Sequence, residues 1–322
     1  MKTTIDWLAF RTKSSHYDVL EALRPCFGTV GDLLELKTGL KGKDGWTHGC
    51  EIALPDNVLG RIDYGGDSQK EWVRVNITGA GCEWVQDWAA VENLDQVLVQ
   101  AEIKRLDIAL TTFKNQVNDA LVAAAYEAGK FTCGGRPPAM RSIINSDPTA
   151  GRTRYIGKRE NHKFLRCYEK GWELLKDLPE NAQFIKKVPG LLVEFDHFGM
   201  ASPQDVYRVE LELKDVDKHI PFTVIGRRDD VFAGAYPFCA ELLPGAEHWV
   251  MQELPSFKPR AALLKSLENA FLSYGGIIKA AHLAYGGDDA ALLAVARMVM
   301  AEEPSRRLVD SGVLSVDHEP VF

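Results

Sequence analysis

Short strand-like segments, separated by helical patterns, constrain the fold of this chain most strongly. Residues 60–64 and 71–77 alternate apolar and polar side chains, with the two-residue period of a half-buried strand. Further strands are expected at 4–10, 104–110 and 206–213, and helices at 16–23, 83–99 and 118–129. Such mixed, closely spaced elements predict an α+β fold of antiparallel sheets with packed helices.

The sequence carries a weak internal echo. Ile5-Asp-Trp-Leu and Leu106-Asp-Ile-Ala both place an aspartate in an apolar strand that is soon followed by a helix, which indicates two similar halves. After Asp217 the pattern changes, and residues 257–285 and 288–303 have helical spacing. We therefore predict one domain over 1–217 and a mainly helical C-terminal region over 218–322.

Composition excludes several classes of protein. The chain has 322 residues and is 46% hydrophobic, enough for a sizeable core, and it lacks both a signal-like N-terminus and an apolar run of membrane-spanning length. We expect a protein of the bacterial cytoplasm that makes no membrane contact. Its six cysteines form no C-x-x-C pair, which argues against a zinc ribbon or a disulfide framework. No P-loop motif and no His-x-His pair occurs.

Charge is distributed unevenly along the chain. The formal net charge is -7, yet residues 136–176 contain ten basic and four acidic side chains, a local charge of +6. The rest of the chain therefore carries -13. This polarisation suits a phosphate-binding surface, although a solvated basic loop would have the same composition.

Strand alternation groups acidic side chains into a candidate metal site. Residues two apart share a face, so Arg105 and Asp107 lie together, as do Glu210 and Glu212. If both faces belong to one sheet, three carboxylates converge, and such hard oxygen ligands suit Mg²⁺ or Mn²⁺. The alternative is a strand face stabilised by salt bridges, with Asp107 paired only to Arg105.

Tyr168 is the candidate nucleophile, because Arg166 and Lys170 lie on the same face of its strand. A phenol with a pKa near 10 is only ~0.1% ionised at pH 7, a deficit of about 4 kcal/mol for a phenolate nucleophile. The two cations and a divalent metal would each lower that cost. Most strand tyrosines have only a packing role. Tyr155 is the second candidate, but alternation places it with Thr153 and Gly157, a less well-equipped face.

These segments together resemble the replication initiation factor family of filamentous bacteriophages, which is related to plasmid rolling-circle initiators and to relaxases of some integrative conjugative elements. The resemblance covers roughly residues 4–215. It rests on six ordered segments: Ile5–Phe10, Arg105–Leu110, Gly134–Pro137, Arg154–Arg159, Leu165–Lys170 and Arg208–Leu213. At Lys158-Arg159 the chain departs from the serine-containing turn expected in many relatives.

The resemblance implies a site-specific endonuclease that nicks one strand at a replication origin. The enzyme stays joined to the 5′ phosphate through tyrosine and later reseals the strand. Tyr168 would be the nucleophile, with Lys170 and Arg166 as its electrostatic support. The implied metal ligands are Asp107, Glu210 and Glu212, holding Mg²⁺ or Mn²⁺.

Origin DNA is the implied partner, and a host helicase and a second copy of the chain are further candidates. The expected DNA-binding residues are Arg105, Arg152, Arg154, Lys158, Arg159 and Lys163. A conjugative relaxase would use the same chemistry. An origin-binding or repressor protein would use the basic surface without cleaving DNA.

Overall fold

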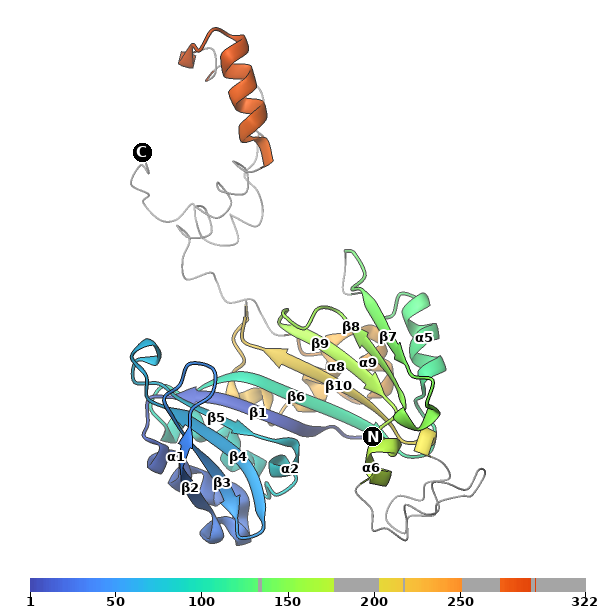
Figure 1. Ribbon diagram of the computed structural model, residues 1–322. Coiled ribbons are helices and arrows are strands. Elements are labelled where there is room, and N and C mark those ends of the chain that lie inside the picture. The colour runs from blue at the N-terminus through green and yellow to red at the C-terminus, as the bar shows by residue number, and fades with distance from the viewer. Residues whose placement is uncertain (133–134, 177–202, 217, 251–272, 291–292, 294–322) are drawn as a thin grey trace. The chain divides into compact units, whose positions relative to one another are not determined.

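Ten strands form one antiparallel sheet in the computed structural model, which describes residues 1–132, 135–176, 203–216, 218–250, 273–290 and 293 (Figure 1). The strands are β1 (Thr4–Thr12), β2 (Glu35–Lys41), β3 (His48–Leu54), β4 (Asn57–Tyr64), β5 (Val73–Ile77), β6 (Glu102–Thr112), β7 (Met140–Ile144), β8 (Arg152–Ile156), β9 (Lys163–Tyr168) and β10 (Tyr207–Lys214). Their order is β2-β3-β4-β5-β1-β6-β10-β9-β8-β7. The predicted antiparallel α+β fold is confirmed.

The strand order reveals two halves of the same topology. β1 and β6 pair antiparallel at the centre, and each is flanked by the last strand of its own half, β5 or β10. From there each half runs outward in reverse chain order, to β2 on one side and to β7 on the other. The weak echo between the strands that contain Asp6 and Asp107 therefore marks the two central strands of a repeated unit.

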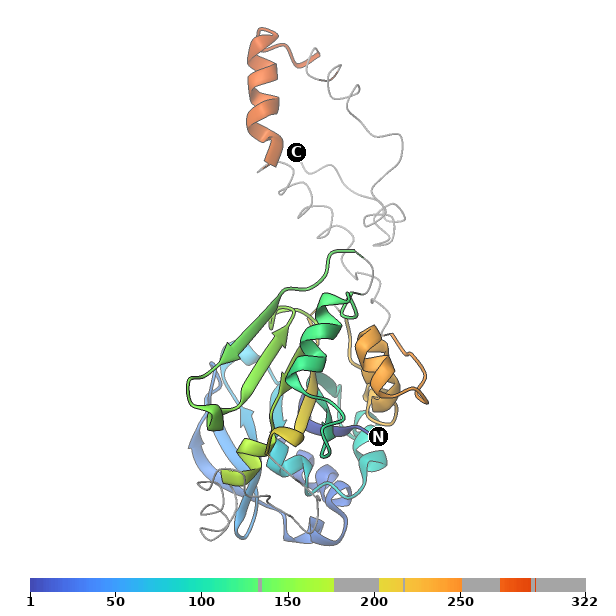
Figure 2. The same ribbon diagram turned by 90° about the vertical axis from the view of Figure 1, so that its right-hand side faces the viewer.

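Helices lie against one face of this sheet, as the side view shows (Figure 2). The α-helices are α1 (His16–Leu23), α2 (Gly79–Cys82), α3 (Trp88–Glu92), α4 (Leu94–Val97), α5 (Asp119–Glu127), α6 (Gly171–Lys176), α8 (Arg228–Ala235) and α9 (Pro237–Leu242). Short 3₁₀ helices are η1 (Arg24–Leu33), η2 (Asp67–Gln69), η3 (Pro148–Ala150), η4 (Pro203–Asp205) and η5 (Phe222–Val224). α1 and α5 follow the central strand of each half, which extends the internal repeat to the helices.

Strand alternation separates an apolar face from a polar one. Leu8 pairs with Leu106, which in turn pairs with Leu213, and all three side chains are buried in the core. α8 and α9 add Phe232 and Phe238 to the same core. The intervening residues of these strands point to the other face of the sheet, where the polar side chains gather.

Local capping explains where several helices begin. The Ser15 side chain accepts a hydrogen bond from the Asp18 backbone, and Asp18 bonds back to Ser15, so a capping box starts α1. Asn118 caps α5 through the Leu121 backbone. The single helix predicted over 83–99 is instead broken, because the Asp87 side chain caps a new short helix, α3, within it.

The described chain divides into two compact units, Met1–Gln252 and Glu253–Phe322. This division does not coincide with the boundary predicted near residue 217, because α8 and α9 contribute to the core of the first unit. In the second unit residues 273–284 are helical, and most of the helices predicted over 257–303 lie outside the described residues. None of the helices in the described part of the chain is both long and apolar enough to cross a membrane.

Candidate active site

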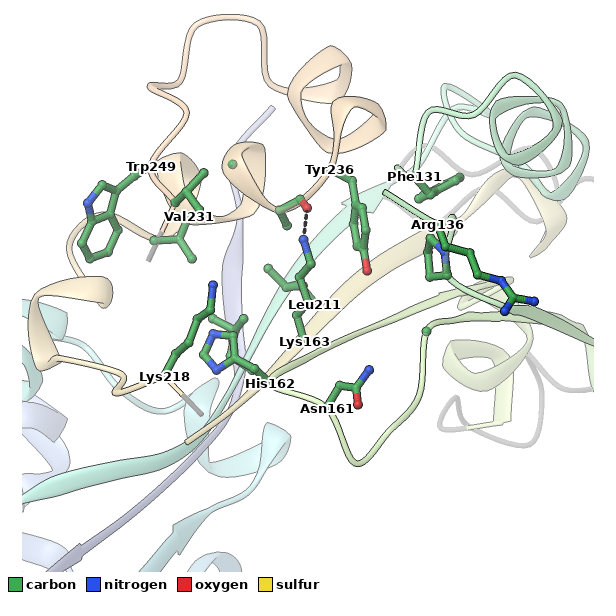
Figure 3. Close-up of a pocket in the computed structure, with 16 residues that line it drawn as sticks. Phe131, Arg136, Asn161, His162, Lys163, Leu211, Lys218, Val231, Tyr236 and Trp249 are labelled. Carbon is green, nitrogen blue, oxygen red and sulfur yellow. Dashed lines mark hydrogen bonds between the residues drawn. The ribbon is translucent and has the colours of Figure 1, made fainter. Parts of the chain in front are cut away.

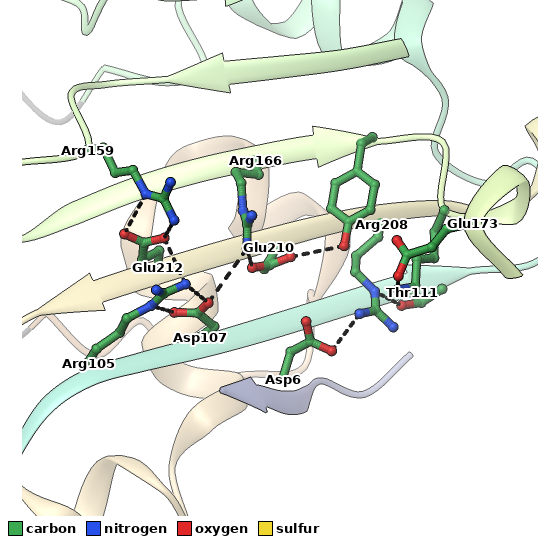
Figure 4. A network of polar contacts seen from close by, with 12 residues as sticks. Asp6, Arg105, Asp107, Thr111, Arg159, Arg166, Glu173, Arg208, Glu210 and Glu212 are labelled. Atoms are coloured by element: carbon green, nitrogen blue, oxygen red, sulfur yellow. Dashed lines mark hydrogen bonds and ion pairs between the residues drawn. The ribbon is translucent and has the colours of Figure 1, made fainter. Parts of the chain in front are cut away.

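The polar face of β6, β10 and β9 brings the predicted acidic residues together (Figure 4). In the β6–β10 pair, Asp107 lies directly opposite Glu212. In the β10–β9 pair, Glu210 lies opposite Arg166. The central position of these three strands in the sheet explains why the carboxylates are close to one another although they are far apart in the sequence.

The three carboxylates are almost fully buried and bonded to cations. Asp107 is 1% exposed, and Arg105 donates to both its oxygens at 2.8 and 2.5 Å. Arg105 also lies 3.1 Å from Glu212, which Arg159 contacts at 3.2 Å. Glu210 forms an ion pair with Arg166, whose guanidinium is 3.7 Å from Asp107. The result is a continuous network of carboxylates and guanidinium groups.

Burial and neighbouring charges shift the pKa values of Asp107 and Glu212 in opposite directions. The pKa of Asp107 is raised to about 7: burial is the main cause, Glu210 and Glu212 act in the same direction, and Arg105 opposes the rise. At Glu212 burial also favours the neutral acid, but hydrogen bonds from Arg159 and Lys214 bring its pKa below the ordinary value. The negative charge of Asp107 is therefore less well compensated than that of Glu212.

Tyr168 joins this network through its hydroxyl, which donates a hydrogen bond to Glu210 Oε2 at 3.1 Å. Burial and the charge of Glu210 raise the pKa of Tyr168, and Arg208 opposes that rise. We expected Arg166 and Lys170 to supply the compensating charge. Lys170 instead forms an ion pair with Glu173 at 2.5 Å, and Arg208 is the cation that lowers the pKa of the phenol.

Arg208 and Asp6 belong to the site, although neither was selected from the sequence. Arg208 lies directly opposite Tyr168 in the β10–β9 pair. Its guanidinium contacts Asp6 at 2.6 Å and donates to Thr111 Oγ1 at 2.9 Å. Two signals could have found them: Arg208 shares the strand face of Glu210, and Asp6 is the acid in the apolar strand of the internal echo.

Three of the predicted DNA-binding residues lie on the opposite, helix-covered face. Arg154 makes a bidentate ion pair with Asp119 of α5, at 2.5 and 2.7 Å. Arg152 is 3.7 Å from the same carboxylate. Lys163 donates to the Ala235 carbonyl at 2.6 Å. Strand alternation places all three side chains away from Tyr168, so the structure does not bring them together with the nucleophile.

Lys158 and Arg159 lie on the turn between β8 and β9, at the edge of the polar face. Both residues are exposed, and both line a pocket of about 410 Å³ together with Tyr155 and Arg166. Tyr155 was assigned to a strand face shared with Thr153 and Gly157. The register shows that this is the face of Tyr168, because Thr153 pairs with Tyr168 and Tyr155 pairs with Arg166.

Another pocket, of about 490 Å³, opens on the helix-covered side (Figure 3). Its lining includes His162 and Lys163 at the start of β9 and Tyr236 and Trp249 near α8 and α9. The Lys163 ammonium lies over the Tyr236 ring, 4.1 Å from its centroid. This contact, with the bond to Ala235, ties β9 to the helical layer and accounts for the position of Lys163.

The acidic trio fits a divalent cation in its donor chemistry. All three side chains are carboxylates, the ligand type that Mg²⁺ and Mn²⁺ prefer, and they lie on adjacent strands. Among the described residues, no three ligands surround one point as they stand. The reason is visible in the contacts: Arg105 bridges Asp107 and Glu212, and Arg166 lies between Asp107 and Glu210.

Comparisons with known proteins agree with the fold and with the resemblance. The chain is similar to a rolling circle replication initiator protein from Geobacillus stearothermophilus, with a TM-score of 0.52 and 17% identity, over 78% of this chain and 99% of that structure. No curated protein matches the chain. The model of the replication initiation factor family matches residues 101–252, which contain β6 to β10 and every candidate site residue except Asp6. The match to the replication initiation factor family thus covers the second half of the sheet, just under half of the chain.

Proposed function

We propose that this protein initiates rolling-circle replication by nicking one strand of origin DNA and later rejoining it, through a tyrosine ester. The hydrogen bond from the Tyr168 hydroxyl to Glu210 carries the proposal. It places a phenol beside a proton acceptor within a carboxylate–guanidinium network. The family match and the similar structure support the biological role.

The reaction can be written from the contacts of Tyr168. Glu210 accepts the phenolic proton, and the tyrosine oxygen attacks the scissile phosphorus. The bond from phosphorus to the 3′ oxygen breaks, this oxygen takes a proton from solvent and leaves as a 3′ hydroxyl, Glu210 returns its proton to solvent, and the 5′ phosphate becomes a tyrosine ester. Reversal of these steps with a free 3′ hydroxyl reseals the strand. Because the ester conserves the energy of the broken bond, no nucleotide cofactor is required.

Cations around the phenol would stabilise the negative charge of the phenolate. Forming a phenolate at pH 7 costs at least about 4 kcal/mol, and burial adds to that cost at Tyr168. Arg208 lies opposite Tyr168 and offsets part of it, while Arg166 is placed beside Glu210. Asp107, Glu210 and Glu212 would hold Mg²⁺ or Mn²⁺, which when bound would polarise the scissile phosphate.

DNA would reach this site across the exposed edge of the polar face. Lys158 and Arg159 are exposed there and offer charges to backbone phosphates. Arg105, inside the network, would bind a phosphate only after releasing Asp107. A conjugative relaxase would use the same arrangement. A repressor or other non-catalytic DNA-binding protein would not require a half-buried tyrosine that is bonded to a buried glutamate.

Supercoiled DNA that carries the chain's own coding region and flanks, incubated with Mn²⁺, tests the proposal. The expected product is open-circular DNA with protein covalently attached to its 5′ end. Tyr168→Phe should abolish both the nick and the adduct. The matched control is Tyr17→Phe, since Tyr17 is an exposed tyrosine on α1. Full activity in Tyr168→Phe, or no adduct with the unaltered protein, would refute the mechanism.

A further inference from the structure

Three side chains from adjacent strands stack into a column on the polar face beside Tyr168. Phe164 of β9 is buried, and its ring lies 5.5 Å from the Tyr155 ring at an interplanar angle of 24°. On β7, the exposed Arg141 places its guanidinium 5.0 Å from the centroid of the same ring. The column therefore runs from the buried ring of Phe164 to the edge of the sheet at β7, where it ends in a flat, cationic group at the surface.

The surroundings of this column suit a nucleotide. Tyr155 and Phe164 line the pocket of about 410 Å³ together with four cations and a single acid, Glu160. The cations are Arg141, Lys158, Arg159 and Arg166. An aromatic surface bordered by cations is how proteins bind single-stranded nucleic acid, with bases stacked on rings and phosphates paired with positive charges.

The position of the column relative to Tyr168 determines which nucleotide would bind at the column. Tyr155 lies directly opposite Arg166, and Tyr168 is two residues farther along β9 on the same face. Two residues of a strand span ~7 Å. A phosphate held at Tyr168 would therefore leave the adjoining nucleotide of an extended strand at the column.

The contacts of Tyr155 involve its ring. Among the described residues no hydrogen bond joins the Tyr155 hydroxyl, whereas the Tyr168 hydroxyl is bonded to Glu210. The Tyr155 ring is contacted by Phe164 and by Arg141. The contacts of Tyr155 therefore use its flat ring, whereas the contact of Tyr168 with Glu210 uses its hydroxyl group.

We propose that Tyr155, supported by Phe164 and flanked by Arg141, is a stacking platform for the base next to the scissile phosphate. Arg141 is exposed and can turn to a phosphate while the base takes its place on the ring, or can itself stack on the base. The assignment rests on the proposed nicking function and makes single-stranded DNA the form recognised at this point, since a base inside a duplex cannot reach the ring.

Binding experiments separate the platform from the chemistry. In a Tyr168→Phe background, which cannot form the ester, fluorescence anisotropy is measured with a labelled (dT)12 and with an abasic 12-mer of the same backbone. Tyr155→Ala should weaken (dT)12 binding ~10-fold and abasic binding less than ~2-fold. Tyr155→Phe should bind both probes with the same affinity as the protein that retains Tyr155. Tyr17→Ala, at an exposed tyrosine on α1, is the control.

The outcomes distinguish this proposal from the nicking mechanism. Equal losses on both probes, or none on (dT)12, would overturn the platform while leaving Tyr168 as the nucleophile. In the protein with an intact Tyr168, Tyr155→Phe should still form the covalent adduct. Loss of the adduct in Tyr155→Phe, with (dT)12 binding preserved, would make Tyr155 the nucleophile and overturn both assignments.

Discussion

Arg208 lies directly opposite Tyr168 in the β9–β10 pair, and its guanidinium is held 2.6 Å from Asp6 on β1. A residue of the N-terminal half therefore fixes the cation that faces the phenol. The central position of β1 and β6 in the sheet makes this contact feasible, since only β6 separates β1 from β10. The repeated halves thus share one site, although the candidate nucleophile belongs to the second half.

Removing the charge of Arg208 should slow nicking. Arg208→Gln deletes the cation that opposes the raised pKa of Tyr168, and we expect a loss of about 10- to 100-fold in the rate of adduct formation at saturating DNA. Arg208→Lys retains a positive charge and should lose less. The rates are measured by gel quantification of the adduct, with circular dichroism as the check on folding. Equal losses in the two variants would contradict a charge effect.

Arg154 should contribute to stability. Its guanidinium is paired with the buried Asp119, so Arg154→Ala leaves a carboxylate without its partner and should lower the free energy of unfolding by about 3 kcal/mol in urea titrations. The double variant Arg154→Met/Asp119→Leu should recover much of that loss. Arg152→Ala is the control, since its side chain is 56% exposed, and it should change stability by less than about 0.5 kcal/mol.

Arg159 should contribute to DNA binding. Its side chain is 53% exposed at the edge of the polar face, where it can pair with a phosphate. Arg159→Ala should reduce the slope of log affinity against log salt by about 1, measured with a single-stranded oligonucleotide between about 50 and 200 mM salt. Arg152→Ala, an arginine on the other face, should leave the slope unchanged. A reduced slope in that control would place DNA on the helix-covered side.

The central strands and the grouping of the candidate site residues could be predicted from the sequence, because both depend on the alternation of side chains along a strand. Residues two apart along β6, β9 or β10 must share a face, which grouped Glu210 with Glu212 and Tyr168 with Arg166. The helical patterns over 16–23 and 118–129 likewise located α1 and α5. The sequence did not predict β2, β3 or β7. Of these, β2 and β7 are the edge strands of the sheet, and their side chains are mostly exposed.

The contacts between strands could not be read from the sequence. Which face of β8 belongs with Tyr168 depends on the β8–β9 register, and that register brought Tyr155 to the site. Arg154 and Asp119 are 35 positions apart, and Arg208 and Asp6 are 202 apart, so composition alone does not reveal these pairs. The basic segment therefore contains arginines on the polar face and arginines on the helix-covered face, which only the fold distinguishes.

His16 should make stability depend on pH. Its ring stacks on Tyr64 at 4.1 Å, and burial lowers its pKa despite the opposing charge of Asp18. Below the unfolded pKa of about 6.5 the unfolded chain binds the proton more tightly, so stability is complete above that pH and is lost as pH falls through the folded pKa. Unfolding free energies between about pH 5 and 8 should show a flatter dependence in His16→Gln. The same pH dependence of the unfolding free energy in the unaltered protein and in His16→Gln would exclude His16 as its cause.

Asp107 should be required for metal-dependent cleavage. Asp107→Asn keeps the size of the side chain but removes the charge that a divalent cation would pair with, while Arg105 can still bond its oxygen. Calorimetry should show Mn²⁺ affinity reduced at least ~10-fold, and adduct formation in Mn²⁺ should be lost. Binding of (dT)12 should persist, because this carboxylate repels phosphate. Unchanged Mn²⁺ affinity in a folded variant would leave Asp107 with only its ion pairs to Arg105 and Arg166.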